Sequence, residues 1–208
     1  MAQYKLHYFN GKGRAEVCRY MFALADQKYE DIRYERDVWP KHKPDMPFGQ
    51  VPVLEVVDGS NSFKLPQSTT IYRYLANKLG FAGKSLEESA KIDAYADLIN
   101  DMLAGMIVAF HESDEEKKKE LFKKYFSETI HGFLVHFDKV LGESKSGYIV
   151  GDNISWVDLF LVVTWEWIPE EPRGHIFAAH APCHAHFEKV KALPKIAEWI
   201  AKRPVTEM

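Results

Sequence analysis

The spacing of apolar residues changes near residue 80, and this change constrains the fold more than any other feature. Before it, Tyr4, Leu6 and Tyr8 alternate with other residues, which is typical of a half-buried strand. After it, apolar side chains recur at helical spacing in two long stripes: Ile92, Tyr95, Ile99, Met102, Leu103, Met106, Ile107 and Phe110, then Leu121, Phe122, Tyr125, Phe126, Phe133, Leu134, Phe137, Val140 and Leu141. We therefore predict an α/β part followed by an all-helical part.

The first part begins with a predicted βαβ unit. Residues 10–13 (NGKG) break the first strand, and helical spacing of apolar residues starts after Arg14. Residues 29–34 predict a second strand. Such a unit places its two strands in parallel.

The rest of this part predicts a loop, a hairpin and a helix, so that its order is βαβ–ββα. Residues 39–52 contain four prolines and a glycine, which we interpret as a long functional loop without regular structure. Residues 53–57 and 63–65 predict antiparallel strands joined by a turn at Asp58-Gly59. Ser68 is expected to be the N-cap of the following helix.

Glycine-containing and charged segments divide the rest of the chain. We expect one domain at residues 1–79, a linker at 80–84 and an all-helical domain at 85–208. The charged run 113–119 is interpreted as a solvated turn. Ser155 and Asp158 have the spacing of a capping box, and Pro194 begins the last helix.

Composition excludes several classes of protein. The 208 residues carry 27 basic and 30 acidic side chains, a formal net charge of −3, which excludes a strongly basic nucleic-acid binder. No segment approaches the roughly 18 apolar residues of a membrane span, and the first residues do not form a signal peptide. Cys18 and Cys183 are far apart in the sequence, which fits a reducing compartment. We expect a cytoplasmic protein that contacts neither membranes nor nucleic acids.

A set of short motifs, in order along the chain, resembles the cytosolic glutathione transferases and specifically their sigma class. The motifs are Tyr8 in residues 4–16 (YKLHYFNGKGRAE), Trp39-Pro40, Lys43, residues 47–55 (PFGQVPVLE), Gln67-Ser68 and residues 155–158 (SWVD). The resemblance implies a thioredoxin-like N-terminal domain, an α-helical C-terminal domain and a homodimer. It also implies conjugation of glutathione to hydrophobic electrophiles in detoxification, and leaves glutathione peroxidase activity open.

The resemblance assigns catalysis to Tyr8 and Arg14. Conjugation needs the glutathione thiolate, whereas a free thiol has a pKa of about 8.5 and is mostly protonated at neutral pH. A phenol that donates a hydrogen bond to the sulfur favours the anion and lowers that pKa. Tyr8 is expected to be this donor, and Arg14 to add positive potential.

Glutathione binding is assigned to further residues by the same resemblance. Pro52 is expected to be cis, so that Val51, next to Gln50, pairs with the cysteinyl backbone. The γ-glutamyl carboxylate is expected at Gln67 and Ser68, where a helix begins. Trp39 and Lys43 are expected to bind the glycyl carboxylate. Asp101 is expected to reach across a dimer interface and bind the γ-glutamyl ammonium of glutathione in the neighbouring subunit.

A second-substrate pocket is expected to be apolar and to accept varied electrophiles. The resemblance places it at Gly11, Gly13, Arg14, Leu103, Val108, Phe160, Thr164 and Met208. Val108, Phe160 and Thr164 differ from the residues found in prostaglandin-isomerising relatives. Two alternatives stay open: a glutathione-dependent prostaglandin isomerase, and a non-catalytic protein that carries haem or other hydrophobic ligands, or resembles a lens crystallin.

No metal is expected. The acidic group Asp97, Asn100 and Asp101 is one carboxylate short of the magnesium-like cluster of a relative, and a hard divalent cation prefers several oxygen ligands. A second candidate cluster consists of side chains that bind zinc elsewhere, at a spacing that matches no standard finger: His175, His180, Cys183, His184 and His186. A contribution of these histidines to haem binding is left open.

Overall fold

The computed structural model describes residues 3–59 and 61–206, which divide into two compact units. The first unit combines the chain up to Phe81 with the segment from Pro194 onward, and the second runs from Ala82 to Leu193. The sequence assigned residues 85–208 to one helical domain, whereas the structure places the last helix with the first unit. The last helix belongs to the first unit because its Trp199 donates a hydrogen bond to the buried carboxylate of Glu16.

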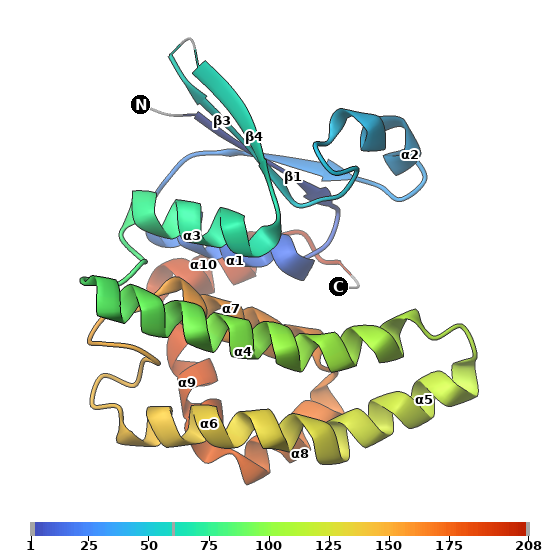
Figure 1. Ribbon diagram of the computed structural model, residues 1–208, viewed down its shortest axis with the longest axis vertical. Coiled ribbons are helices and arrows are strands. Elements are labelled where there is room, and N and C mark those ends of the chain that lie inside the picture. The colour runs from blue at the N-terminus through green and yellow to red at the C-terminus, as the bar shows by residue number, and fades with distance from the viewer. Residues whose placement is uncertain (1–2, 60, 207–208) are drawn as a thin grey trace. The chain divides into compact units, whose positions relative to one another are not determined.

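The first unit is built on a four-stranded sheet with the order β2-β1-β3-β4 (Figure 1). Its strands are β1 (Gln3–Phe9), β2 (Glu30–Tyr34), β3 (Val53–Asp58) and β4 (Asn61–Pro66). β1 and β2 are parallel, and β3 is antiparallel to both β1 and β4. The predicted βαβ unit and hairpin are confirmed, and Leu6 faces Leu54 in register within the core.

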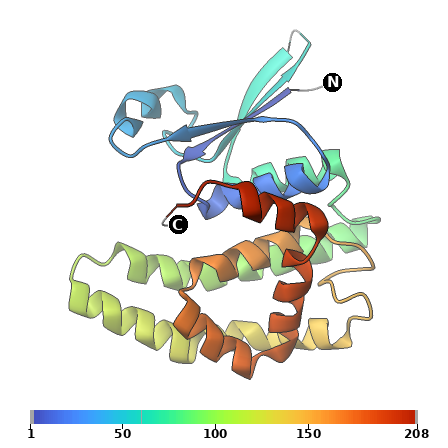
Figure 2. The same cartoon turned by 180° about the vertical axis from the view of Figure 1, so that it is seen from behind.

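Helices accompany this sheet. They are α1 (Glu16–Leu24), α2 (Trp39–His42), α3 (Ser68–Leu79) and α10 (Pro194–Lys202), with 3₁₀ turns at Gly13–Ala15 and Lys43–Asp45. α1 contacts both α3 and α10 (Figures 1 and 2). The expectation that residues 39–52 lack regular structure is wrong for their first half, where Pro40 and Pro44 lie in first-turn positions that need no N–H donor.

The start of α3 also differs from expectation. Gln67, not Ser68, is the N-cap residue, and no side chain caps the helix. Ser68 is the first helical residue and is buried. Its hydroxyl is engaged elsewhere, by the guanidinium of Arg14.

Buried Glu16 fastens α10 to α1. Its carboxylate accepts hydrogen bonds from Arg19 Nη1 at 2.9 Å, Trp199 Nε1 at 2.7 Å and Arg203 Nη1 at 2.9 Å. Burial opposes the charge, but Arg19 and the donors on α10 and just beyond it outweigh that effect and hold the pKa of Glu16 below its ordinary value. A buried carboxylate with such partners ties the last segment to the first unit.

The loop before β3 rests on a small core of its own. Tyr34, Met46 and Val53 are buried together, and Trp39 and Val51 pack against them. This packing holds both ends of the segment 39–52 against β2 and β3.

The second unit is helical. It comprises α4 (Leu86–His111), α5 (Glu115–Lys124), a π-helical segment (Tyr125–Thr129), α6 (Ile130–Glu143), α7 (Trp156–Trp167), α8 (Glu170–Ala179) and α9 (Ala181–Lys191). The two long apolar stripes and the helices beginning near Ser155 and Pro194 are confirmed. The charged run is not a simple turn, because Asp114 caps α5 and accepts from the backbone N–H groups of Glu116 and Lys117. None of the helices in the described residues is long and apolar enough to cross a membrane.

The predicted capping box at α7 is present and is extended by the fold. Asp158, fully buried, accepts from the Ser155 N–H at 2.8 Å and from the Ile149 N–H at 2.8 Å. His186 Nε2 on α9 lies 3.0 Å from the same carboxylate. One side chain therefore joins α7, α9 and the loop before α7.

We predict that Asp158→Asn lowers the free energy of unfolding by about 2 to 4 kcal/mol. The amide keeps one acceptor oxygen and turns an NH₂ group towards buried donors. Urea denaturation followed by tryptophan fluorescence measures the change. Asp152→Asn, at an exposed position nearby, is the matched control and should have almost no effect; equal stability of the two variants would contradict the prediction.

Candidate active site

The Tyr8 phenol lies at the end of β1, beside the turn that leads into α1. Its oxygen accepts a hydrogen bond from the backbone N–H of Arg14, with 3.1 Å between N and O. That bond uses an oxygen lone pair and leaves the phenol proton to be donated to another acceptor. Burial raises the pKa of Tyr8, although the Arg14 amide and nearby guanidinium charges act in the opposite direction. At neutral pH the group is therefore an uncharged hydrogen-bond donor.

Gly13 makes room for this phenol. Its φ of +38° lies in the region that favours glycine, and a Cβ at this position would overlap the Tyr8 phenol oxygen. The glycine thus lets the turn pass directly over the tyrosine ring.

Arg14 links the turn to α3. Its Nη1 donates to the Ser68 hydroxyl over 3.2 Å. The backbone of Arg14 therefore serves Tyr8 while its side chain reaches the start of the next helix.

A pocket of about 260 Å³ opens at this point in the first unit. Its walls are formed by Arg14, Phe48, Gln50, Val51, Pro52, Pro66, Gln67 and Ser68. Most of these were predicted as site residues; Phe48 and Pro66 were not. The Val51–Pro52 peptide bond is cis, as the resemblance implied.

The sequence contained only an indirect signal for the two residues that were missed. Phe48 lies in the same motif as Gln50 to Pro52, and 62% of it is exposed. Pro66 is the residue directly before the Gln67-Ser68 pair. Neither carries a titratable or hydrogen-donating side chain, so chemistry alone did not mark them.

Three residues of the first unit that were predicted to bind glutathione lie outside the pocket walls. Tyr8 is joined to the pocket through Arg14. Trp39 packs against the rings of Phe9 and Tyr34, with centroids 5.3 and 5.9 Å away. Lys43 is exposed and its side chain lies close to Gly49.

Comparison with known proteins covers nearly the whole chain. Residues 4–77 match the glutathione S-transferase N-terminal domain model, and residues 100–203 match a glutathione S-transferase C-terminal domain model. Haematopoietic prostaglandin D synthase of Gallus gallus is 40% identical over 99% of both chains. The chain belongs to the glutathione S-transferase family.

Solved glutathione S-transferases are similar throughout their length. A Nu-class enzyme from Haemonchus contortus is 40% identical, with a TM-score of 0.83 over 100% of both chains. A monomeric glutathione S-transferase of the hookworm Necator americanus is 43% identical, with a TM-score of 0.83 over 99% of this chain and 100% of that one. The thioredoxin-like first unit and helical second unit follow this family fold, and glutathione is the co-substrate of the family.

The residues expected to bind the second substrate of this glutathione S-transferase differ in exposure. Gly13 begins the 3₁₀ turn Gly13–Ala15, which contains Arg14, and Gly11 lies two residues before it. In the second unit Leu103, Phe160 and Thr164 are buried, while Val108 is 64% exposed. The Thr164 hydroxyl donates to the Phe160 carbonyl oxygen on its own helix. Met208 lies outside the described residues.

The side chains of the second candidate metal cluster have different surroundings in the structure. Within residues 3–59 and 61–206 no group of histidine, cysteine and acidic side chains is arranged to hold a metal ion. His180 is buried, with Nδ1 2.5 Å from Asp138 and Nε2 2.7 Å from His131 Nδ1. His175 and His184 lie exposed. Cys18 and Cys183 are both buried free thiols, and burial raises the pKa of each.

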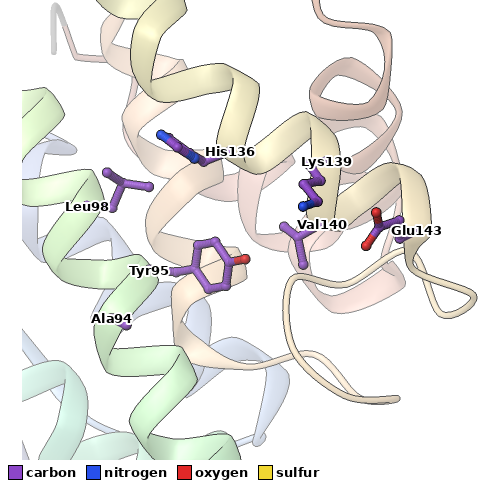
Figure 3. A pocket seen from close by; sticks show the side chains of 7 residues that line it. All are labelled: Ala94, Tyr95, Leu98, His136, Lys139, Val140 and Glu143. Carbon is purple, nitrogen blue, oxygen red and sulfur yellow. The ribbon is translucent and has the colours of Figure 1, made fainter.

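A larger pocket, of about 510 Å³, lies between α4 and α6 in the second unit (Figure 3). Tyr95 of α4 points towards Val140 of α6, and Leu98 of α4 lies beside His136 of α6. None of the residues predicted for glutathione or electrophile binding lines this pocket. Several of the residues predicted for glutathione binding line the smaller pocket, so the larger volume of this pocket does not make it the candidate active site.

Gln67 has an unusual backbone conformation within the smaller pocket. Its φ is +73°, and in the described part of the chain only one other non-glycine residue, Asp26, has a positive φ. Such a conformation costs about 1 to 3 kcal/mol and is often retained for a function. We expect that the Gln67 side chain binds glutathione, and that this function accounts for a non-glycine residue in the strained conformation.

We predict that Gln67→Gly raises the free energy of unfolding by about 1 kcal/mol and weakens glutathione binding about fivefold, as loss of one hydrogen bond would. Thermal unfolding and calorimetric titration with glutathione measure the two effects. Asp26→Gly, at the other strained position, is the control: it should leave glutathione affinity unchanged. Unchanged affinity in Gln67→Gly would argue against a binding role for this side chain.

Proposed function

We propose that this chain conjugates the thiolate of glutathione to hydrophobic electrophiles, with Tyr8 donating its phenol proton as a hydrogen bond to the sulfur. The observation that carries the proposal is the Tyr8 phenol, protonated at neutral pH, oriented by the Arg14 amide and adjoining the pocket. A hydrogen bond to the charged form of the thiol lowers its pKa, and each unit corresponds to about 1.4 kcal/mol.

The pocket chemistry suits the rest of glutathione. The first amides of α3, from Ser68 onward, point out of the helix end and favour the γ-glutamyl carboxylate. Val51 offers its backbone to the cysteinyl residue as an added strand would. Lys43 and the Trp39 indole N–H are assigned to the glycyl carboxylate.

Tyr8 does not act as a base in this proposal. Because its pKa is raised, the phenol keeps its proton, and the thiol proton leaves to solvent. The thiolate then attacks an electrophilic carbon, forming a carbon–sulfur bond as the leaving group departs with its electron pair. Gly11, Gly13, Arg14, Leu103, Val108, Phe160, Thr164 and Met208 are assigned to contacts with the electrophile.

Finer features of the proposal rest on the resemblance. We assign the chain to the sigma class, to detoxification in the cytoplasm, and to a homodimer, with peroxide reduction as a second reaction of the same thiolate. The Nu-class relative and the prostaglandin D synthase are each 40% identical to this chain, so identity shows the family and does not distinguish the class.

Glutathione-dependent prostaglandin isomerisation is the second candidate. It is favoured by 40% identity to a prostaglandin D synthase over 99% of both chains. Val108, which is 64% exposed, differs from the residue expected in prostaglandin-isomerising relatives, and this difference favours conjugation over isomerisation. Formation of a single product from a prostaglandin endoperoxide distinguishes this activity from conjugation. A haem or hydrophobic-ligand carrier would bind its ligand and show negligible conjugation.

We predict that Tyr8→Phe lowers kcat/KM for conjugation of a chloronitroaromatic about 10- to 100-fold at neutral pH, and that activity recovers towards alkaline pH. The reason is a rise of the thiol pKa by about one to two units when the phenol donor is lost. Since Tyr8 stays protonated, a pH series over the neutral range reports the thiol. Tyr4→Phe, on the same strand and away from the pocket, is the control; equal profiles for the two variants would overturn the assignment.

The dimer assignment has a structural argument in α4. Asp101 is exposed, and its spacing of seven and three residues from Ala94 and Leu98 places it on their face of the helix. Ala94 and Leu98 line the groove between α4 and α6. A second copy covering this groove would also meet Asp101, which is the carboxylate assigned to the γ-glutamyl ammonium of the partner subunit.

We predict that the protein sediments as a dimer and that Leu98→Glu converts it to a monomer with about tenfold weaker glutathione binding, since a charge-assisted hydrogen bond is lost. Sedimentation velocity and calorimetric titration measure both. Ala178→Glu, at an exposed position on α8, should change neither. If the wild-type protein sediments as a monomer and binds glutathione as tightly as both variants do, Asp101 completes no neighbouring site. The hookworm relative, itself monomeric, makes this outcome worth testing.

A further inference from the structure

Tyr72 of α3 touches the catalytic turn from inside the first unit. Its side chain is completely buried, and its hydroxyl donates a hydrogen bond to the backbone carbonyl oxygen of Arg14. Burial raises the pKa of Tyr72 well above its ordinary value, so the hydroxyl remains a donor throughout the range in which enzymes are assayed.

Two hydrogen bonds tie Arg14 to α3. Arg14 Nη1 donates to the Ser68 hydroxyl, and the Tyr72 hydroxyl donates to the Arg14 carbonyl oxygen. Side chains of one helix therefore hold both ends of Arg14, its guanidinium and its backbone.

The Tyr8 bond begins at the same residue. The N–H that donates to the Tyr8 phenol and the carbonyl held by Tyr72 both belong to Arg14. Only the φ and ψ angles of Arg14 separate the two peptide planes, because the peptides themselves are rigid. Holding the carbonyl therefore restricts the direction of the N–H that orients the phenol.

We propose that Tyr72 is a positioning residue of the conjugation reaction, acting on the thiolate through Arg14 and Tyr8. This inference rests on the proposed function, and it deepens it by adding a group behind the catalytic tyrosine. Tyr72 does not touch glutathione; it maintains the geometry in which the Tyr8 proton faces the sulfur.

The test is Tyr72→Phe, which removes one oxygen and keeps the ring in its buried place. We expect the pKa of the enzyme-bound glutathione thiol to rise by about half to one unit, which lowers kcat/KM about three- to tenfold below that pKa. The thiolate absorbance of bound glutathione, titrated with pH, measures the shift directly and needs no electrophile. At alkaline pH the rates of variant and wild type should converge.

Tyr74→Phe is the matched control, because Tyr74 lies on the same helix, is partly exposed and packs against Phe63. A double variant adds a sharper condition: in a Tyr8→Phe background, removal of the Tyr72 hydroxyl should no longer shift the thiol pKa. A uniform loss of rate with an unchanged pH profile, or a shift of equal size in the double variant, would show that Tyr72 acts on stability alone and would overturn the inference.

Two further results separate this inference from the proposed function. If the wild-type protein binds glutathione without lowering its thiol pKa, the proposed function and the inference fail together. If the wild type lowers that pKa and Tyr72→Phe matches it, the inference alone fails. Should Tyr72→Phe not fold, Tyr72→Met fills the buried position without a hydroxyl; a raised thiol pKa in that variant supports the inference, and an unchanged one overturns it.

Discussion

A carboxylate buried at the start of α1 determines much of the arrangement around the active site. Glu16 is stable there only because Arg19, Trp199 and Arg203 donate to it. Arg19 is itself buried, and the same Nη1 donates to the Gly11 carbonyl oxygen over 2.7 Å. One buried ion pair therefore holds the last helix against α1 and also holds the glycine-containing loop that covers Tyr8.

The proposed glutathione site is characterised by hydrogen-bond donors more than by apolar area. The pocket places the Arg14 guanidinium, the outward amides of α3 and the exposed backbone near Val51 around a small volume. These groups suit a peptide with two carboxylates and a thiolate. The walls of the larger pocket between α4 and α6 also contain donors, on His136 and Lys139, but no residue from the start of a helix. Charge and hydrogen-bond direction, more than pocket size, therefore distinguish the site.

The fold was predictable where a local rule decides the structure. Alternation in β1, the Ser155–Asp158 box and Pro194 each act within a few residues, and the structure has the predicted element at each place. Expectations failed where tertiary contacts decide. Ser68 was assigned as a cap from its type alone, but Arg14, distant in sequence, engages its hydroxyl. Tyr72 was not marked at all, since a tyrosine on an apolar helix face carries no sequence sign of the carbonyl it meets.

The way in which Arg14 is used has a consequence for catalysis. A guanidinium at the sulfur would lower the thiol pKa far below neutral, but a thiolate with a lower pKa is also a weaker nucleophile, with a Brønsted coefficient of about 0.4 to 0.5. The rate is greatest when the thiol pKa lies near the working pH. In this structure the Arg14 guanidinium is directed to Ser68, and the backbone N–H of Arg14 contacts the Tyr8 phenol. In the proposed reaction a neutral phenol, oriented by a neutral amide, would favour the thiolate moderately and so preserve its reactivity towards a carbon electrophile.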